Sequence, residues 1–136
     1  RKWKTSVGQY FLDSRTYKVS FNNLEKARIA ISSSESKQFD REKLKFKNIE
    51  KIGSIAYKIA LVANGTIDAT LSFSKKSDWD IAAASIILSE AGGKITSLSG
   101  EKIFYNSINL KIPSLISANV AIHKKFCDKI RFNESI

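Results

Sequence analysis

The stretch from Ser77 to Gly93 places the strongest constraint on the fold, because it reads as a helix with its own start and stop signals. Ser77 and Asp78 can cap its start, since side-chain oxygens there accept from free backbone N–H groups. Gly92-Gly93 supplies the permissive backbone that ends helices. One apolar stripe at helical spacing predicts a buried face, formed by Ile81, Ala84, Leu88 and Ala91.

The rest of the chain alternates predicted strands with predicted helices, which indicates an α/β sheet covered on both faces. We expect strands near 27–31, 66–73, 94–96 and 115–118, and a hairpin within 1–20. We expect helices from 39 to just before Ile52, from an N-cap at Ser54 to 63, and from a cap at Asn119 to about 131. A hydroxyl-rich loop at 32–36 follows the first of these strands, where α/β sheets place ligand contacts.

The composition narrows the classes of protein. The net charge of +10 suits anionic ligands, but the lysines are spread along the chain, so a solvated basic surface or attraction of a phosphorylated substrate is favoured over nucleic-acid binding. No apolar run could span a bilayer, and the single Cys127 fits a reducing cytoplasm. The chain has no methionine and begins Arg1-Lys2-Trp3, so we expect a fragment or separated domain of a longer protein.

Three segments carry a resemblance to a known family. Trp79-Asp80-Ile81-Ala82-Ala83 followed by Glu90-Ala91-Gly92-Gly93, the segment 53–58 (Gly-Ser-Ile-Ala-Tyr-Lys) and the segment 62–69 stand in the order and spacing of blocks in the inositol monophosphatase family. That family comprises Mg²⁺-dependent phosphomonoesterases, including bisphosphate nucleotidases. The resemblance is strong over 53–97.

The resemblance implies a fold and a domain organisation. It implies a mixed sheet of about five strands flanked by helices, the C-terminal half of a layered αβαβα sugar-phosphatase-like fold. Residues 1–136 would form one C-terminal domain, with the 1–20 hairpin near the inter-domain junction. The family's N-terminal Glu and Asp-Pro-(Ile/Leu)-Asp-Gly-Thr segment has no counterpart here, so we expect the isolated chain to be inactive. A homodimer would form through the intact protein.

The resemblance also implies site residues. Asp80 matches the family's metal-ligand Asp and would bind Mg²⁺, an ion that takes oxygen ligands. Gly53 and Ser54 match a substrate-side turn, although an ordinary helix start explains them equally well. Lys58 matches a lysine that faces a second phosphate in nucleotidase-like members, and a solvated lysine is the alternative. Asp68 and Asp78 read as structural residues.

One departure from the family bears on the substrate. Inositol-specific members carry a Glu seven residues before the metal-binding Asp, and Phe73 stands at that place here. The change favours a bisphosphate nucleotide over an inositol phosphate, and Lys75-Lys76 adds positive charge beside the site. A serine of the family approaches the substrate near Ser33 or Ser34.

A non-catalytic basic domain that binds RNA or a protein partner is the competing function. His123 and Cys127 share the last predicted helix, where we expect a surface or cap histidine and a buried cysteine.

Overall fold

The computed structural model describes residues 18–20, 24–41, 46–106 and 111–134. Most of the hairpin predicted over 1–20 lies outside these residues, and residues 18–20 belong to no strand. Within the described part of the chain, no helix is long and apolar enough to cross a membrane.

Five strands form one mixed sheet with the order β2-β1-β3-β7-β5. Strand β1 runs parallel to β2 and β3, whereas β7 runs antiparallel to β3 and β5. The strands are β1 (Arg28–Ile31), β2 (Asn48–Lys51), β3 (Ala69–Ser72), β5 (Gly93–Thr96) and β7 (Leu115–Asn119). A two-stranded antiparallel pair joins β4 (Lys76–Ser77) to β6 (Lys111–Ile112). The predicted mixed five-stranded sheet is therefore confirmed.

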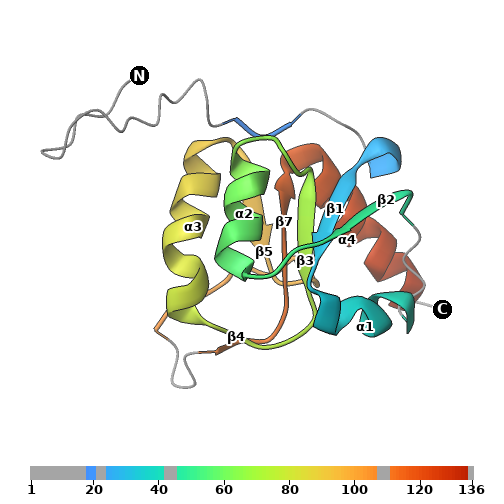
Figure 1. Ribbon diagram of the computed structural model, residues 1–136. Helices are drawn as coiled ribbons and strands as arrows, with labels where there is room; N and C mark the ends of the chain where they lie inside the picture. The colour runs from blue at the N-terminus through green and yellow to red at the C-terminus, as the bar shows by residue number, and fades with distance from the viewer. Residues whose placement is uncertain (1–17, 21–23, 42–45, 107–110, 135–136) are drawn as a thin grey trace, which may run out of the picture.

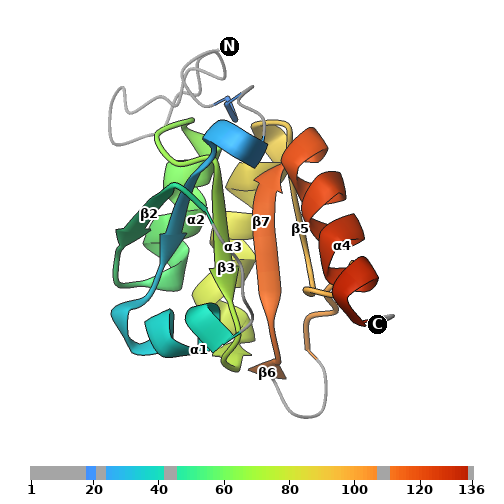
Figure 2. The same cartoon turned by 90° about the vertical axis from the view of Figure 1, so that its right-hand side faces the viewer.

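Helices cover both faces of the sheet. Helices α2 (Ile55–Ala63) and α3 (Asp78–Glu90) lie side by side on one face, and α4 (Val120–Glu134) covers the other (Figure 1 and Figure 2). The shorter helices are η1 (Leu24–Lys26), η2 (Ser33–Glu35) and α1 (Ser36–Arg41). Each face has its own apolar core, with Ile59, Ile81 and Leu88 on the α2–α3 side and Ile29, Leu71 and Phe126 on the α4 side.

The sequence predicts residues that cap or end the long helices at four positions, and three of these predictions are confirmed. The stripe of α3 is buried, and the helix gives way to Gly92 at a φ of 89°, which favours glycine. The Ser54 hydroxyl accepts from the Tyr57 N–H at 3.3 Å at the start of α2. The Asn119 Oδ1 accepts from the Ile122 N–H at 2.7 Å and caps α4. At the start of α3, by contrast, Ser77 occupies the cap position but makes no side-chain capping bond.

The helix predicted from 39 to just before Ile52 is wrong over its second half. The structure has the short α1, which ends at Arg41, and then the edge strand β2. All four residues of β2 are exposed, so the strand has no buried face and no apolar alternation to reveal it. The strand forms because its backbone pairs with β1, and a pattern of side chains does not reveal such pairing.

Candidate phosphate and metal site

A pocket opens where the carboxyl ends of the parallel strands meet the starts of two helices. Strands β1 and β3 point toward the same edge of the sheet, and α2 and α3 both begin at that edge (Figure 1). The pocket has a volume of about 280 Å³ and is lined by Ser32, Ser54, Ile55, Ala56, Lys76 and Asp80. Ligands of α/β sheets bind at this edge, because loops and helix starts converge there.

The two helix starts make the pocket suitable for an anion. The first N–H groups of a helix lack intrahelical partners, and the helix dipole adds partial positive charge at the same end. Ser54 and the first residues of α2 form one wall, while Asp80 lies in the first turn of α3. Ser54 also has a φ of 58°, an uncommon left-handed backbone conformation for a residue with a side chain.

Asp80 presents its carboxylate to this pocket. Its side chain is exposed, and it has no hydrogen-bond or ion-pair partner among the residues that the structure describes. A free carboxylate beside hydroxyl oxygens can act as an oxygen ligand to Mg²⁺. The described residues nevertheless hold no cluster of three or more His, Cys, Asp or Glu side chains that could bind a metal ion. Asp80 therefore fits as one ligand of an incomplete set.

Lys58 contacts a residue that lines the pocket, although it does not line the pocket itself. The alternative of a solvated lysine is wrong, because the residue is 0% exposed. Its Nζ donates to the Ser32 Oγ at 2.5 Å, and Ser32 lines the pocket at the end of β1. Burial lowers the pKa of Lys58, the Glu35 carboxylate raises it, and the charge of Lys76 lowers it further. Lys58 thus places a positive charge behind the hydroxyl of Ser32.

Lys76 and Gly53 differ in how closely they approach this pocket. Lys76 lines it, and its Nζ donates to the Ser74 Oγ at 3.0 Å. Lys75 is exposed and is not among the lining residues. Gly53 does not line the pocket either, and a Cβ built on it would meet nothing within 4 Å. Of Lys75 and Lys76, only Lys76 therefore lines the pocket. At position 53 there is room for a side chain, so crowding does not explain the glycine.

Glu35 is a residue of this region that the sequence analysis did not identify. It is only 6% exposed, and its Oε1 accepts from the Ser72 hydroxyl and from the N–H groups of Phe73 and Ser74. Burial alone raises the pKa of the Glu35 carboxyl, but the hydrogen bonds from Ser74 and Ser72 and the charge of Lys76 outweigh burial and lower it. In the sequence, the only sign of a role for Glu35 is its position in the loop that follows a predicted strand.

Phe73 lies beside this region and not in the Asp80 pocket. It lines a separate pocket of about 280 Å³ with Ser34, Glu35, Lys37, Gln38 and Ser74. It is half-buried and packs against the core beneath α4. Ser34 therefore lies in the same pocket as Phe73, whereas Ser32 faces Asp80.

Asp68 and Asp78 have structural roles. The Asp68 carboxylate is buried and accepts from the Arg28 backbone N–H at 2.7 Å and from the Arg28 Nε at 3.2 Å. The Asp78 Oδ2 accepts from the Asn106 N–H at 2.5 Å, so Asp78 holds a distant segment and does not act as the predicted cap. Trp79, between Asp78 and Asp80, is 69% exposed.

The last helix corrects one prediction. His123 is not at the surface but is 4% exposed, and its Nε2 lies 2.6 Å from the Thr96 Oγ1. Burial, and to a lesser extent the charge of Lys94, lowers the pKa of His123 to about 4. Cys127 is buried beside it, as predicted.

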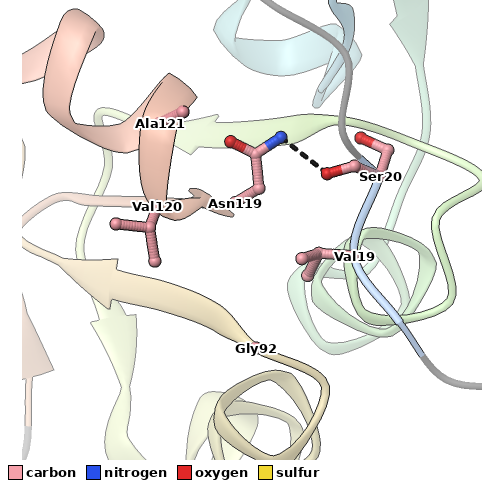
Figure 3. Close-up of a pocket in the computed structure, with 6 residues that line it drawn as sticks. All are labelled: Val19, Ser20, Gly92, Asn119, Val120 and Ala121. Atoms are coloured by element: carbon pink, nitrogen blue, oxygen red, sulfur yellow. Dashed lines mark hydrogen bonds between the residues drawn. The ribbon is translucent and has the colours of Figure 1, made fainter.

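A further pocket lies at the opposite edge of the sheet (Figure 3). It has a volume of about 330 Å³ and lies between the start of α4 and the end of α3. Its lining residues are Val19, Ser20, Gly92, Asn119, Val120 and Ala121, and the Asn119 Nδ2 donates across it to the Ser20 carbonyl at 2.8 Å. None of these lining residues carries a charged side chain, so the pocket differs in chemistry from the one at Asp80.

Comparison with known proteins places this arrangement in a family. The profile of the inositol monophosphatase family matches residues 5–134. The chain is 29% identical over 125 residues to an inositol-1-monophosphatase of Bacillus subtilis, which covers 86% of the chain and 45% of that protein. It is 32% identical over 101 residues to the 3′(2′),5′-bisphosphate nucleotidase CysQ of Aggregatibacter actinomycetemcomitans, which covers 69% of the chain and 37% of that protein.

The solved structures agree. An IMPase of Thermotoga maritima superimposes with a TM-score of 0.71 and 29% identity, over 92% of this chain and 48% of that one. The chain thus spans about half of that protein and less than half of the two curated relatives. Because the family profile matches nearly the whole sequence and the sheet superimposes on a family structure, the chain belongs to the inositol monophosphatase family.

Proposed function

We propose that this chain is the C-terminal part of a Mg²⁺-dependent phosphomonoesterase that hydrolyses a small phosphorylated metabolite. The observation that carries the proposal is the pocket at the sheet edge, where Asp80, Lys76 and two helix starts meet. The family and the names of the relatives support a phosphatase of phosphorylated small molecules. The activity belongs to the intact protein, since the chain covers only part of these relatives.

Asp80 would hold the metal ion in this site. A bound Mg²⁺ would polarise a phosphoryl oxygen and lower the pKa of a bound water. Asp80 supplies one oxygen ligand, and no described cluster supplies the others. We therefore expect the isolated chain to release no phosphate, because its partner ligands would come from the part of the protein that it lacks.

The other pocket residues would bind the substrate. Helix-start N–H groups and the Lys76 ammonium would bind phosphate oxygens. Lys58 would strengthen the Ser32 hydroxyl as a donor, because a cation beside that oxygen polarises its O–H bond. Ser54 would contribute its backbone N–H or its hydroxyl proton, since the cap of α2 uses its hydroxyl oxygen only as an acceptor. Gly53 stays a predicted substrate-side residue without a contact of its own in the pocket.

A substrate with two phosphates suits this charge distribution best. Lys76 lines the pocket, Lys58 contacts the lining residue Ser32 from another element, and the chain carries a net charge of +10. A bisphosphate nucleotide or a sugar bisphosphate would use both cations, whereas an inositol monophosphate would use one. Position 73 supports the same preference, because Phe73 supplies no carboxylate to accept hydrogen bonds from inositol hydroxyls and its ring lines the neighbouring pocket.

The test is phosphate release by the intact protein with Mg²⁺ on adenosine 3′,5′-bisphosphate, an inositol phosphate and fructose bisphosphate. Asp80→Asn should lower kcat/KM by about 100-fold or more, because a catalytic metal contributes several kcal/mol to the transition state. Glu90→Gln is the matched control, since Glu90 is an exposed acidic residue at the other end of the same helix. It should keep wild-type activity.

Two results would overturn the proposal. One is phosphate release that Asp80→Asn leaves unchanged, and the other is no release on any substrate. A steep loss of RNA affinity with rising salt, measured by fluorescence anisotropy in the absence of phosphatase activity, would instead favour a basic binding domain.

A further inference from the structure

We infer that Glu35 is a positioning residue for the pocket, because its carboxylate fixes the loop that carries Lys76 and leads to Asp80. The consequence for catalysis rests on the proposed function. The fixing of the loop is a property of the fold and can be measured separately.

The contact itself is concentrated on one oxygen. The Glu35 Oε1 accepts from the Ser72 Oγ at 3.0 Å, the Phe73 N–H at 3.0 Å and the Ser74 N–H at 2.8 Å. These three donors come from consecutive residues at the end of β3. Hydrogen bonds to an ionised carboxylate are stronger than neutral ones, so this group anchors the point where the loop leaves the sheet.

The loop transmits this anchoring to the pocket over a short length of chain. Ser74, whose N–H donates to Glu35, also accepts from the Lys76 Nζ through its hydroxyl at 3.0 Å. Lys76 and Ser77 then form β4, and α3 begins at Asp78. A shift of the loop at Ser74 would therefore move both the Lys76 ammonium and the first turn that carries Asp80.

The charge of Glu35 has a second effect on the pocket. Its carboxylate stabilises the protonated form of Lys58, which burial and the Lys76 charge oppose. Lys76 in turn stabilises the ionised form of Glu35. One buried anion thus interacts with the charges of both Lys58 and Lys76, and it favours the protonated form of Lys58.

The unpaired oxygen of Glu35 separates this role from a simple structural bond. The buried Oε2 has no hydrogen-bond partner within the described part of the chain. The single amide oxygen of a glutamine could accept the same three bonds, so the carboxylate is not required by the loop geometry alone. Burying an unpartnered polar oxygen costs about 1–3 kcal/mol, so the Glu35 Oε2 does not stabilise the loop by hydrogen bonding. The negative charge is therefore the property that distinguishes Glu35 from glutamine.

The test compares Glu35→Gln, which keeps the acceptor and removes the charge, with Glu35→Ala, which removes both. Ser72→Ala is the matched control, because it deletes one hydroxyl donor, which lies near both the Glu35 Oε1 and the Ser74 carbonyl, without changing any charge. Hydrogen exchange of the Phe73 and Ser74 amides in the intact protein measures the loop directly. Glu35→Ala should speed exchange about tenfold or more, whereas Glu35→Gln and Ser72→Ala should change it by less than about threefold.

Kinetics then measure the charge. In Glu35→Gln the protonated form of Lys58 is less stable, so the alkaline limb of the pH profile of kcat/KM should move down by about half a unit or more. The KM should rise more than kcat falls, because Lys58 acts on phosphate binding through the Ser32 hydroxyl that it contacts. Ser72→Ala should keep the wild-type profile.

The outcomes are distinguishable. Unchanged amide exchange in Glu35→Ala would overturn the anchoring, and an unchanged pH profile in Glu35→Gln would overturn the role of the charge. If the wild-type protein releases no phosphate, the proposed function fails. The exchange measurement, together with the affinity for inorganic phosphate in wild type and Glu35→Gln, would then still decide the role of Glu35.

Discussion

Acidification should destabilise this fold through His123. The residue is buried against Thr96, and its pKa in the folded chain is lowered to about 4 from an ordinary value of 6.5. Between about pH 4 and pH 6.5, His123 is therefore protonated in the unfolded chain and neutral in the folded chain. Stability is fully present above about pH 6.5 and falls as the pH drops toward 4, below which the folded state also becomes protonated.

The magnitude follows from the size of the shift. Each pKa unit corresponds to about 1.4 kcal/mol, so this shift amounts to roughly 3 kcal/mol at full protonation. Most of that loss should be complete by about pH 4.5. For a domain with a typical unfolding free energy of about 5–15 kcal/mol, the change is large enough to measure in one titration series.

The assay is urea unfolding monitored by circular dichroism near pH 7.5 and near pH 4.5. The reference variant is His123→Gln, which keeps a polar atom able to reach Thr96 but does not titrate. Carboxylates such as Glu35 also lose stability in acid, since the pKa of Glu35 is lowered in the folded state. The informative quantity is therefore the extra loss of the wild type over the variant, about 2 kcal/mol or more.

A direct measurement can refute the reasoning. His123 is the only histidine in the chain, so its imidazole NMR signals are unambiguous. A titration midpoint near 6.5, or an equal loss of stability in wild type and His123→Gln, would show that the buried ring accepts a proton without cost.

Two further substitutions test contacts that join distant parts of the chain, both by urea unfolding. Asp68→Asn weakens the bonds that its buried carboxylate accepts from the Arg28 backbone and guanidinium, and should cost about 1–3 kcal/mol, while a midpoint within error of wild type would contradict this. Asn119→Ala removes the cap on the Ile122 N–H and the bond to the Ser20 carbonyl. It should cost about 1–2 kcal/mol, and an equal cost for Asn119→Asp, which retains the capping oxygen, would exclude the cap as the cause.

The elements that the sequence predicts well are those whose signals are local. Helices α2 and α4 carry side-chain caps within the same turn as their first N–H groups, and α3 has an apolar stripe at helical spacing. The buried strands β3 and β7 contain apolar residues at short intervals, which the sequence shows directly. Strand β2 lacks both kinds of signal because its side chains are exposed and its partner β1 lies about twenty residues earlier.

The residues of the site also differ in whether a local sequence pattern predicts them. Asp80, which lines the pocket, could be singled out from the sequence because it lies within a continuous motif. The burial of Lys58 depends on the end of β1, 26 residues earlier in the chain, where Ser32 accepts from its ammonium. Glu35 depends on the end of β3, 37 to 39 residues later. Neither relationship leaves a pattern within a helix or a strand, so both required the three-dimensional arrangement.

The position of Asp80 makes its chemistry separable from the stability of the fold. Its carboxylate is exposed and has no partner in the described part of the chain, whereas the acidic residues that stabilise the fold are buried and bonded. Replacing an exposed, unbonded carboxylate usually changes the free energy of unfolding by less than about 0.5 kcal/mol. Asp80→Asn should therefore unfold at the wild-type urea midpoint. A loss of phosphatase activity in that variant would report on the pocket and not on a weakened sheet.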